Sequence, residues 1–151
     1  FNLIFQLTHI YAHLMNEGIG LRQLLDYYFV LSMLNVNCEM LTSLQKELKE
    51  LGLWKFAGAI MYIMQEVFGM PASRLIVPPN EKYGKFVLNE VLEAGNFGKH
   101  DARNRFGRSK LGHNLQRVYR DIRLVRYFPA EALCEPLFRI WHFFWRLKYK
   151  K

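Results

Sequence analysis

The sequence predicts an all-α protein, a compact bundle of about seven helices in a single domain. Seven segments carry apolar residues at the three- and four-residue spacing of an amphipathic helix. No segment shows the two-residue alternation of a strand between hairpin turns. A chain of 151 residues is an ordinary length for one domain and can bury a sizeable core without disulfides or a metal.

The first two helices follow from this spacing. The first has an apolar stripe that advances in steps of four and three residues, formed by Leu3, Leu7, Ile10 and Leu14. Two glycines at 18 and 20 then provide a turn. The second helix, about residues 20–34, is apolar nearly all round, so we expect it to lie centrally.

Local signals delimit the next three helices. Asn37 is the expected N-cap of a helix over 38–51, and Asn80 caps another that runs to about residue 94. Between them, a helix over about 53–68 contains the small residues Ala57, Gly58 and Ala59, which allow close packing. A linker rich in glycine and proline, residues 69–79, separates this helix from the next.

The last two helices follow a long polar loop, residues 96–110, whose length predicts a functional or a mobile role. The sixth helix has an apolar stripe and is broken by Pro129; the seventh has Pro136 near its first turn. Its aromatic and basic composition also suits a membrane surface or a missing partner domain. We expect its aromatic stripe to dock against the core, which is the commoner arrangement.

Cysteine content and hydropathy indicate a soluble cytoplasmic domain. Cys38 and Cys134 lie far apart without metal-ligand spacing, which favours two buried free thiols in a reducing compartment. No apolar run has the ~18 residues of a membrane span, and no signal-peptide pattern is present.

Charge is distributed unevenly along the chain. Residues 1–96 carry 7 Lys and Arg against 9 Asp and Glu, or −2, whereas residues 97–151 carry 14 against 4, or +10. This asymmetry predicts attraction of the C-terminal third to an anion. Arginines recur at every third residue of the sixth helix: Arg117, Arg120, Arg123 and Arg126. This spacing places them on a ridge that winds around the solvent face of the helix. Such a ridge slightly favours a solvated surface over a nucleic-acid groove.

His9 and His13 are one turn apart on a polar stripe of the first helix, so both face the same way. Such a pair is half of a helical metal site, but a metalloprotease motif also needs a glutamate where this chain has Ile10. We weigh three interpretations: satisfied structural histidines first, histidines that line a polar groove second, and a metal site last.

Arg22 and Asp26 lie one turn apart within the apolar second helix. The favoured interpretation is a buried ion pair that fixes the turn between the first two helices, because a guanidinium readily satisfies a carboxylate. The alternative places Arg22 on a phosphate.

The chain has no P-loop, no dinucleotide-binding glycines after a strand, no nucleophile elbow and no CxxC pair, so it holds no self-sufficient catalytic centre.

Four segments together resemble the helical C-terminal portion of a bacterial family of uncharacterised nucleotidyltransferases, which belong with the DNA polymerase beta-like nucleotidyltransferases. These segments are HIYAHLMNEGIGLRQLLDYYFVL, LGLWKFAGAIMYIMQEVFGM, EAGNFGKHDARNRFG and VRYFPAEAL. The most specific parts are the pattern of His9, His13, Gly20, Arg22 and Asp26 and the block at residues 95–98. The resemblance covers most of the chain.

The resemblance implies that residues 1–151 are the helical C-terminal domain of a larger protein. An upstream α/β catalytic domain, absent from this chain, would carry a Gly-Ser loop and paired acidic residues that hold a divalent metal such as Mg²⁺ and a nucleoside triphosphate. This chain would act on the substrate side, without catalytic or metal-binding residues of its own. Its candidate phosphate-contacting or orienting residues are His9, His13, Arg22, Asp26, Asn96, His100 and Arg105.

Two other functions stay open. One is a basic helical binding module for nucleic acid or another polyanion, and the other is a purely structural interaction domain.

Overall fold

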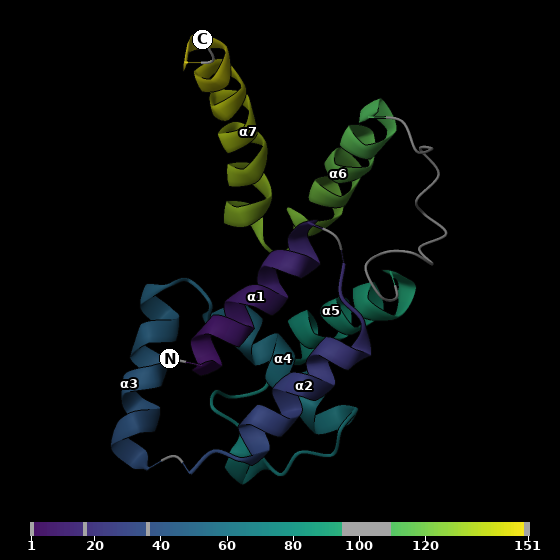
Figure 1. The fold of residues 1–151 in the computed structure, drawn as a ribbon. Coiled ribbons are helices and arrows are strands. Elements are labelled where there is room, and N and C mark those ends of the chain that lie inside the picture. The colour runs from purple at the N-terminus through teal and green to yellow at the C-terminus, as the bar shows by residue number, and fades with distance from the viewer. Residues whose placement is uncertain (1, 17, 36, 95–109, 150–151) are drawn as a thin grey trace. The chain divides into compact units, whose positions relative to one another are not determined.

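A computed structural model describes residues 2–16, 18–35, 37–94 and 110–149 of the chain. These residues form seven α-helices and one 3-10 helix and contain no strand, which confirms the predicted all-α class (Figure 1). The helices belong to two compact units, Phe1–Ala102 and Arg103–Lys151. No helix among the described residues is both long enough and apolar enough to cross a membrane.

The first unit is built on the pairing of α4 (Trp54–Glu66) with α5 (Glu81–Ala94), its most extensive contact between helices. Small residues permit this close approach. Gly58 is buried, and a Cβ added to it would lie only 3.2 Å from the carbonyl oxygen of Pro78. Gly84 of α5 lies so close to Tyr62 of α4 that an added Cβ would overlap the tyrosine side chain. The small residues expected at 57–59 are therefore confirmed as core.

The helix α1 (Asn2–Asn16) buries the apolar stripe that its spacing predicts. Its Tyr11 ring packs on the Phe56 ring of α4, with centroids 4.3 Å apart. The polar stripe lies next to this apolar stripe on α1 and is partly at the surface, with Asn2 and His9 exposed. Burial of one side thus fixes the direction in which the two α1 histidines point.

The helix α2 (Leu21–Ser32) packs on α1, but it is not the central helix expected from its composition. It buries Leu24, Tyr27 and Leu31, which share one face. Leu25 and Phe29 on the other face are exposed, although they are equally apolar. Position around the helix, and not composition, decides which of its apolar residues enter the core.

Side-chain caps begin two of the helices as predicted. Asn37 accepts a hydrogen bond from the N–H of Met40, 2.8 Å away, at the start of α3 (Cys38–Glu50). Asn80 accepts one from the N–H of Tyr83, 3.2 Å away, at the start of α5. Each bond satisfies an N–H that the first helical turn leaves without a helical partner.

The linker between α4 and α5 contains the 3-10 helix η1 (Ala72–Arg74). The Arg74 guanidinium donates hydrogen bonds to the carbonyl oxygens of Ser32 and Leu34, at 2.8 and 3.0 Å. The Gln45 side chain donates another to the carbonyl oxygen of Ile76, at 2.9 Å. These bonds tie the linker to the end of α2 and to α3.

The second unit is a helical hairpin of α6 (Lys110–Leu124) and α7 (Pro129–Tyr149). Figure 1 shows the two helices diverging from the short turn that joins them. The expected position of Pro136 near the start of the last helix is wrong, because α7 begins at Pro129 and contains Pro136 in its interior. Proline suits the first helical turn, where its missing N–H costs nothing, so Pro129 begins α7, whereas α6 already ends at Leu124.

Much of the apolar surface of this hairpin is exposed. Three residues of the predicted apolar stripe of α6 are exposed: Leu115, Val118 and Ile122. Ten large apolar side chains of α7 are between 45% and 66% exposed: Leu133, Leu137, Phe138, Ile140, Trp141, Phe143, Phe144, Trp145, Leu147 and Tyr149. The hairpin itself therefore does not bury the aromatic stripe of this helix, and the docking of this stripe against the core stays a prediction.

Two further expectations need correction. Cys38 and Cys134 are free thiols as predicted, but both are exposed, since one begins α3 and the other lies on an open face of α7. Arg120, expected on the solvent face of α6, is buried with 7% of its surface exposed. Only part of the predicted arginine ridge therefore faces solvent.

Candidate functional site

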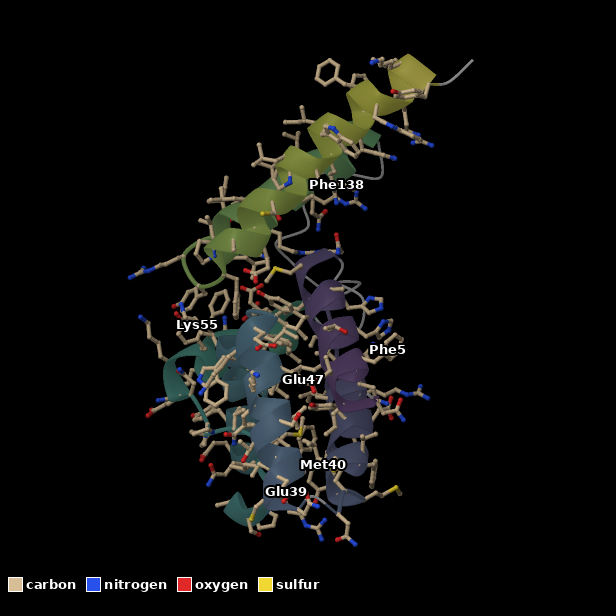
Figure 2. All side chains as sticks on the ribbon, turned by 90° about the vertical axis from the view of Figure 1, so that its left-hand side faces the viewer. Phe5, Glu39, Met40, Glu47, Lys55 and Phe138 are labelled. Atoms are coloured by element: carbon tan, nitrogen blue, oxygen red, sulfur yellow. The ribbon has the colours of Figure 1, made fainter. Side chains whose placement is uncertain are left out.

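The two α1 histidines meet at their ring nitrogens. The Nε2 atoms of His9 and His13 are 3.1 Å apart, and the rings form an edge-to-face pair with centroids 4.4 Å apart. His9 is exposed and His13 is half-buried. The ring of Phe5 stacks on that of His9 at 6.3 Å, and Figure 2 shows Phe5 on the side of α1 away from α3. The prediction that both histidines point the same way is confirmed.

The predicted buried ion pair between Arg22 and Asp26 is wrong. Both side chains are exposed, and the structure, which describes both residues, shows no ion pair between them. The reason is the rotation of α2, whose buried face passes through Leu24, Tyr27 and Leu31. The Arg22 guanidinium therefore keeps its donors available to an anion that approaches from solvent.

Exposed apolar side chains flank these polar groups on α2. Leu21, Leu25 and Phe29 are between 38% and 51% exposed. We call the outward faces of α1 and α2 the α1–α2 surface, defined by Phe5, His9, His13, Leu21, Arg22, Leu25, Asp26 and Phe29. It combines donors suited to an anion with apolar area suited to another protein surface.

Four of the seven residues predicted for the site thus lie on two helices that pack together. Asn96, His100 and Arg105 lie outside the described residues, as does most of the predicted loop over 96–110. No site geometry is therefore assigned to these three.

A groove in the first unit contains none of the predicted site residues. It has a volume of about 510 Å³ and lies between α1, α2 and α3. Apolar side chains such as Leu3, Val30 and Met40 line it, and Glu47 adds a carboxylate. Figure 2 labels Met40 and Glu47 on α3. No motif could have revealed this groove, because its walls come from three separate helices.

A second cavity, of about 540 Å³, lies between α6 and α7 of the hairpin. Val118, Ile140 and Phe144 give it apolar walls, and Arg117 and Arg139 add positive charge. Its position shows that the two helices are not closely packed along their whole length.

Three rings lie nearly parallel along α7. The Phe138 and His142 rings are 10° from parallel with centroids 5.8 Å apart, and the His142 and Trp145 rings are 10° from parallel at 5.9 Å. Figure 2 labels Phe138 on this helix. Phe138 and Trp145 are exposed, and exposed aromatic rings on a helix that also carries arginines can stack on planar groups.

Magnesium prefers several oxygen ligands, mainly carboxylates. Among the described residues, no group of three or more His, Cys, Asp or Glu side chains is placed to hold a metal ion. On the α1–α2 surface the one described carboxylate is that of Asp26, so this surface does not fit a magnesium site.

Comparisons of the chain with protein-family models, with curated proteins and with solved structures found no match.

Proposed function

We propose that the chain is the helical accessory domain, on the substrate side, of a cytoplasmic nucleotidyltransferase. In this proposal an upstream nucleotidyltransferase domain of the same protein carries the reacting groups. The observation that carries the proposal is Arg22, which is exposed on the α1–α2 surface and makes no ion pair with Asp26. An exposed guanidinium can donate two parallel hydrogen bonds to two oxygens of one phosphate.

The chemistry of nucleotidyl transfer fits this division of labour. Divalent metal ions, held by the acidic residues of the upstream domain, would neutralise the charge that develops on the phosphates. The remaining task is to hold nucleotide and acceptor in line, which a neighbouring surface can do. In this chain Arg22 would hold a phosphate, and His9 or His13 would orient the substrate by hydrogen bonds.

The apolar part of the α1–α2 surface supports the same arrangement. Leu21, Leu25 and Phe29 would be buried against the upstream domain when it docks, which removes their exposed area from water. Docking would also bring Arg22 to the edge of the nucleotide site, because it lies on the same helix face as Leu25 and Phe29.

The test uses the full-length protein with its upstream domain and measures nucleoside triphosphate binding by calorimetry. Hydrogen bonds to a charged group contribute about 1.5–3 kcal/mol, so Arg22→Ala should raise Kd roughly ten- to a hundredfold. Its free energy of unfolding should change by less than about 0.5 kcal/mol, because the side chain is exposed. The matched control is Lys46→Ala, which removes the same charge from α3.

Two results would overturn the proposal. One is a full-length protein that binds no nucleoside triphosphate, and the other is turnover of a nucleoside triphosphate by residues 1–151 alone. An Arg22→Ala variant that binds nucleotide like the wild type would remove Arg22 from the site.

A second candidate function is a binding module for single-stranded nucleic acid or another polyanion. The observation that favours it is the series of parallel rings Phe138, His142 and Trp145 on α7, next to Arg139 and Arg146. If about six phosphates are contacted, affinity for unrelated single-stranded oligonucleotides should fall by roughly 300-fold between about 50 and 200 mM salt. Affinity that does not depend on salt would exclude this candidate.

A further inference from the structure

The histidine pair has a geometry that suits a transition-metal ion. Zinc binds imidazole nitrogen at about 2.0–2.1 Å. With the Nε2 atoms of His9 and His13 separated by 3.1 Å, an ion at about 2.05 Å from each would subtend an angle of roughly 98° between them. This value lies between the angles of octahedral and tetrahedral coordination, so the distance between the two nitrogens is compatible with one ion bound to both.

A bound cation can replace the hydrogen bond between the two Nε2 atoms. Two imidazole lone pairs that face each other at 3.1 Å would repel, so a proton on one Nε2 or a bound cation must lie between them. When both protons are on Nδ1, each Nε2 presents a lone pair to the same point. Either tautomer of the free protein can reach this state by moving one proton, because neutral imidazole exchanges between the two forms.

We propose that His9 and His13 chelate a borderline divalent metal ion such as Zn²⁺ on the surface of α1, with water in the remaining positions. A helix holds the two ligands at a fixed spacing, so little conformational freedom is lost on binding. The site is distinct from the magnesium of the proposed nucleotidyl transfer, because magnesium prefers oxygen ligands and imidazole suits zinc. Its test therefore needs no nucleotide, and in the proposed function the substrate would meet the bound ion in place of the bare imidazole rings.

The experiment titrates Zn²⁺ alone into the 151-residue chain carrying Cys38→Ala and Cys134→Ala, which removes two exposed thiols that also bind zinc. At a zinc concentration of about 100 times Kd, Tm should rise by roughly 5–10 °C, and a chelator should reverse the rise. In long-range proton–nitrogen NMR spectra, the Nε2 resonances of His9 and His13 should shift together.

His9→Ala and His13→Gln should each remove the metal-dependent rise in Tm. His142→Ala is the matched control, because His142 stacks between Phe138 and Trp145 and should leave the rise intact. Equal stabilisation by zinc of the wild type and of both pair variants would overturn the proposal. Absence of any zinc-dependent shift in Tm or in the two Nε2 resonances would overturn it as well. If only one of the two resonances shifts, zinc binds one imidazole and the chelate is excluded.

Discussion

Gly84 on α5 lies directly against the side chain of Tyr62 on α4, in the most extensive helix contact of the first unit. A helical glycine usually costs about 1 kcal/mol relative to alanine, so its presence here needs a reason. The reason is space, because a Cβ at this position would overlap Tyr62.

Gly84→Ala should therefore destabilise the chain, in spite of the better helix propensity of alanine. Overpacking of a core costs about 1–3 kcal/mol, and we expect a loss of that size in the free energy of unfolding from urea denaturation. In a Tyr62→Gly background the obstructing atoms are gone, so the same substitution should become neutral or stabilising. An equal cost in both backgrounds would show that the contact with Tyr62 is not its cause.

Sequence reasoning succeeds here where the signal is local. Asn37 and Asn80 are N-caps as predicted, because a capping side chain bonds an N–H only three residues along the chain. The apolar stripe of α1 is also confirmed, since its residues are all on one side of the helix. The close approach of Gly84 to Tyr62 joins residues on different helices, and no spacing rule within either helix contains it.

The same limit explains the errors at the candidate site. The face of α2 that enters the core is determined by its packing on α1, so composition alone wrongly placed Arg22 and Asp26 inside. The position of the histidine pair was predictable from its four-residue spacing. The 3.1 Å approach of the two ring nitrogens depends on side-chain rotamers, which the sequence does not specify.

Tyr27 of α2 provides a test of buried polarity. Its side chain is fully buried, and its hydroxyl has no hydrogen-bond partner among the described residues. A buried hydroxyl without a partner costs about 1–3 kcal/mol, so Tyr27→Phe should raise the free energy of unfolding by about 1 kcal/mol. The control Tyr28→Phe changes a half-buried residue and should have little effect. A loss of stability in Tyr27→Phe would show that the hydroxyl makes a hydrogen bond.

Burial of Tyr27 also predicts a dependence of stability on alkaline pH. Burial raises the pKa of its phenol well above the ordinary value of 10.0. Below pH 10 the phenol is neutral in both states and has no effect. Above pH 10 the unfolded chain releases the proton while the folded chain retains it, so unfolding becomes favoured by up to about 1.4 kcal/mol per pH unit.

This loss of stability should be smaller in Tyr27→Phe than in the wild type. Urea denaturation at intervals from pH 9 to 11.5 measures it, with Tyr28→Phe as the reference for a tyrosine that is not fully buried. Parallel curves for the wild type and Tyr27→Phe would exclude Tyr27 as the source.

The last prediction concerns the exposed aromatic residues of α7. Buried residues contribute to the free energy of unfolding, whereas exposed residues contribute little and are available to a partner. Phe144 of α7 is 63% exposed and Phe56 of α4 is 1% exposed, although both are phenylalanines in helices. Phe56→Ala should lower the free energy of unfolding by about 3–5 kcal/mol, since it leaves a cavity in the core. Phe144→Ser should change it by less than about 0.5 kcal/mol, because a residue that is exposed in the folded chain gains little from folding.

Fluorescence of a hydrophobic dye should decrease in Phe144→Ser, as the apolar surface of α7 becomes smaller. A loss above about 2 kcal/mol in Phe144→Ser would mean that the folded chain buries this face, which would contradict its availability to a partner.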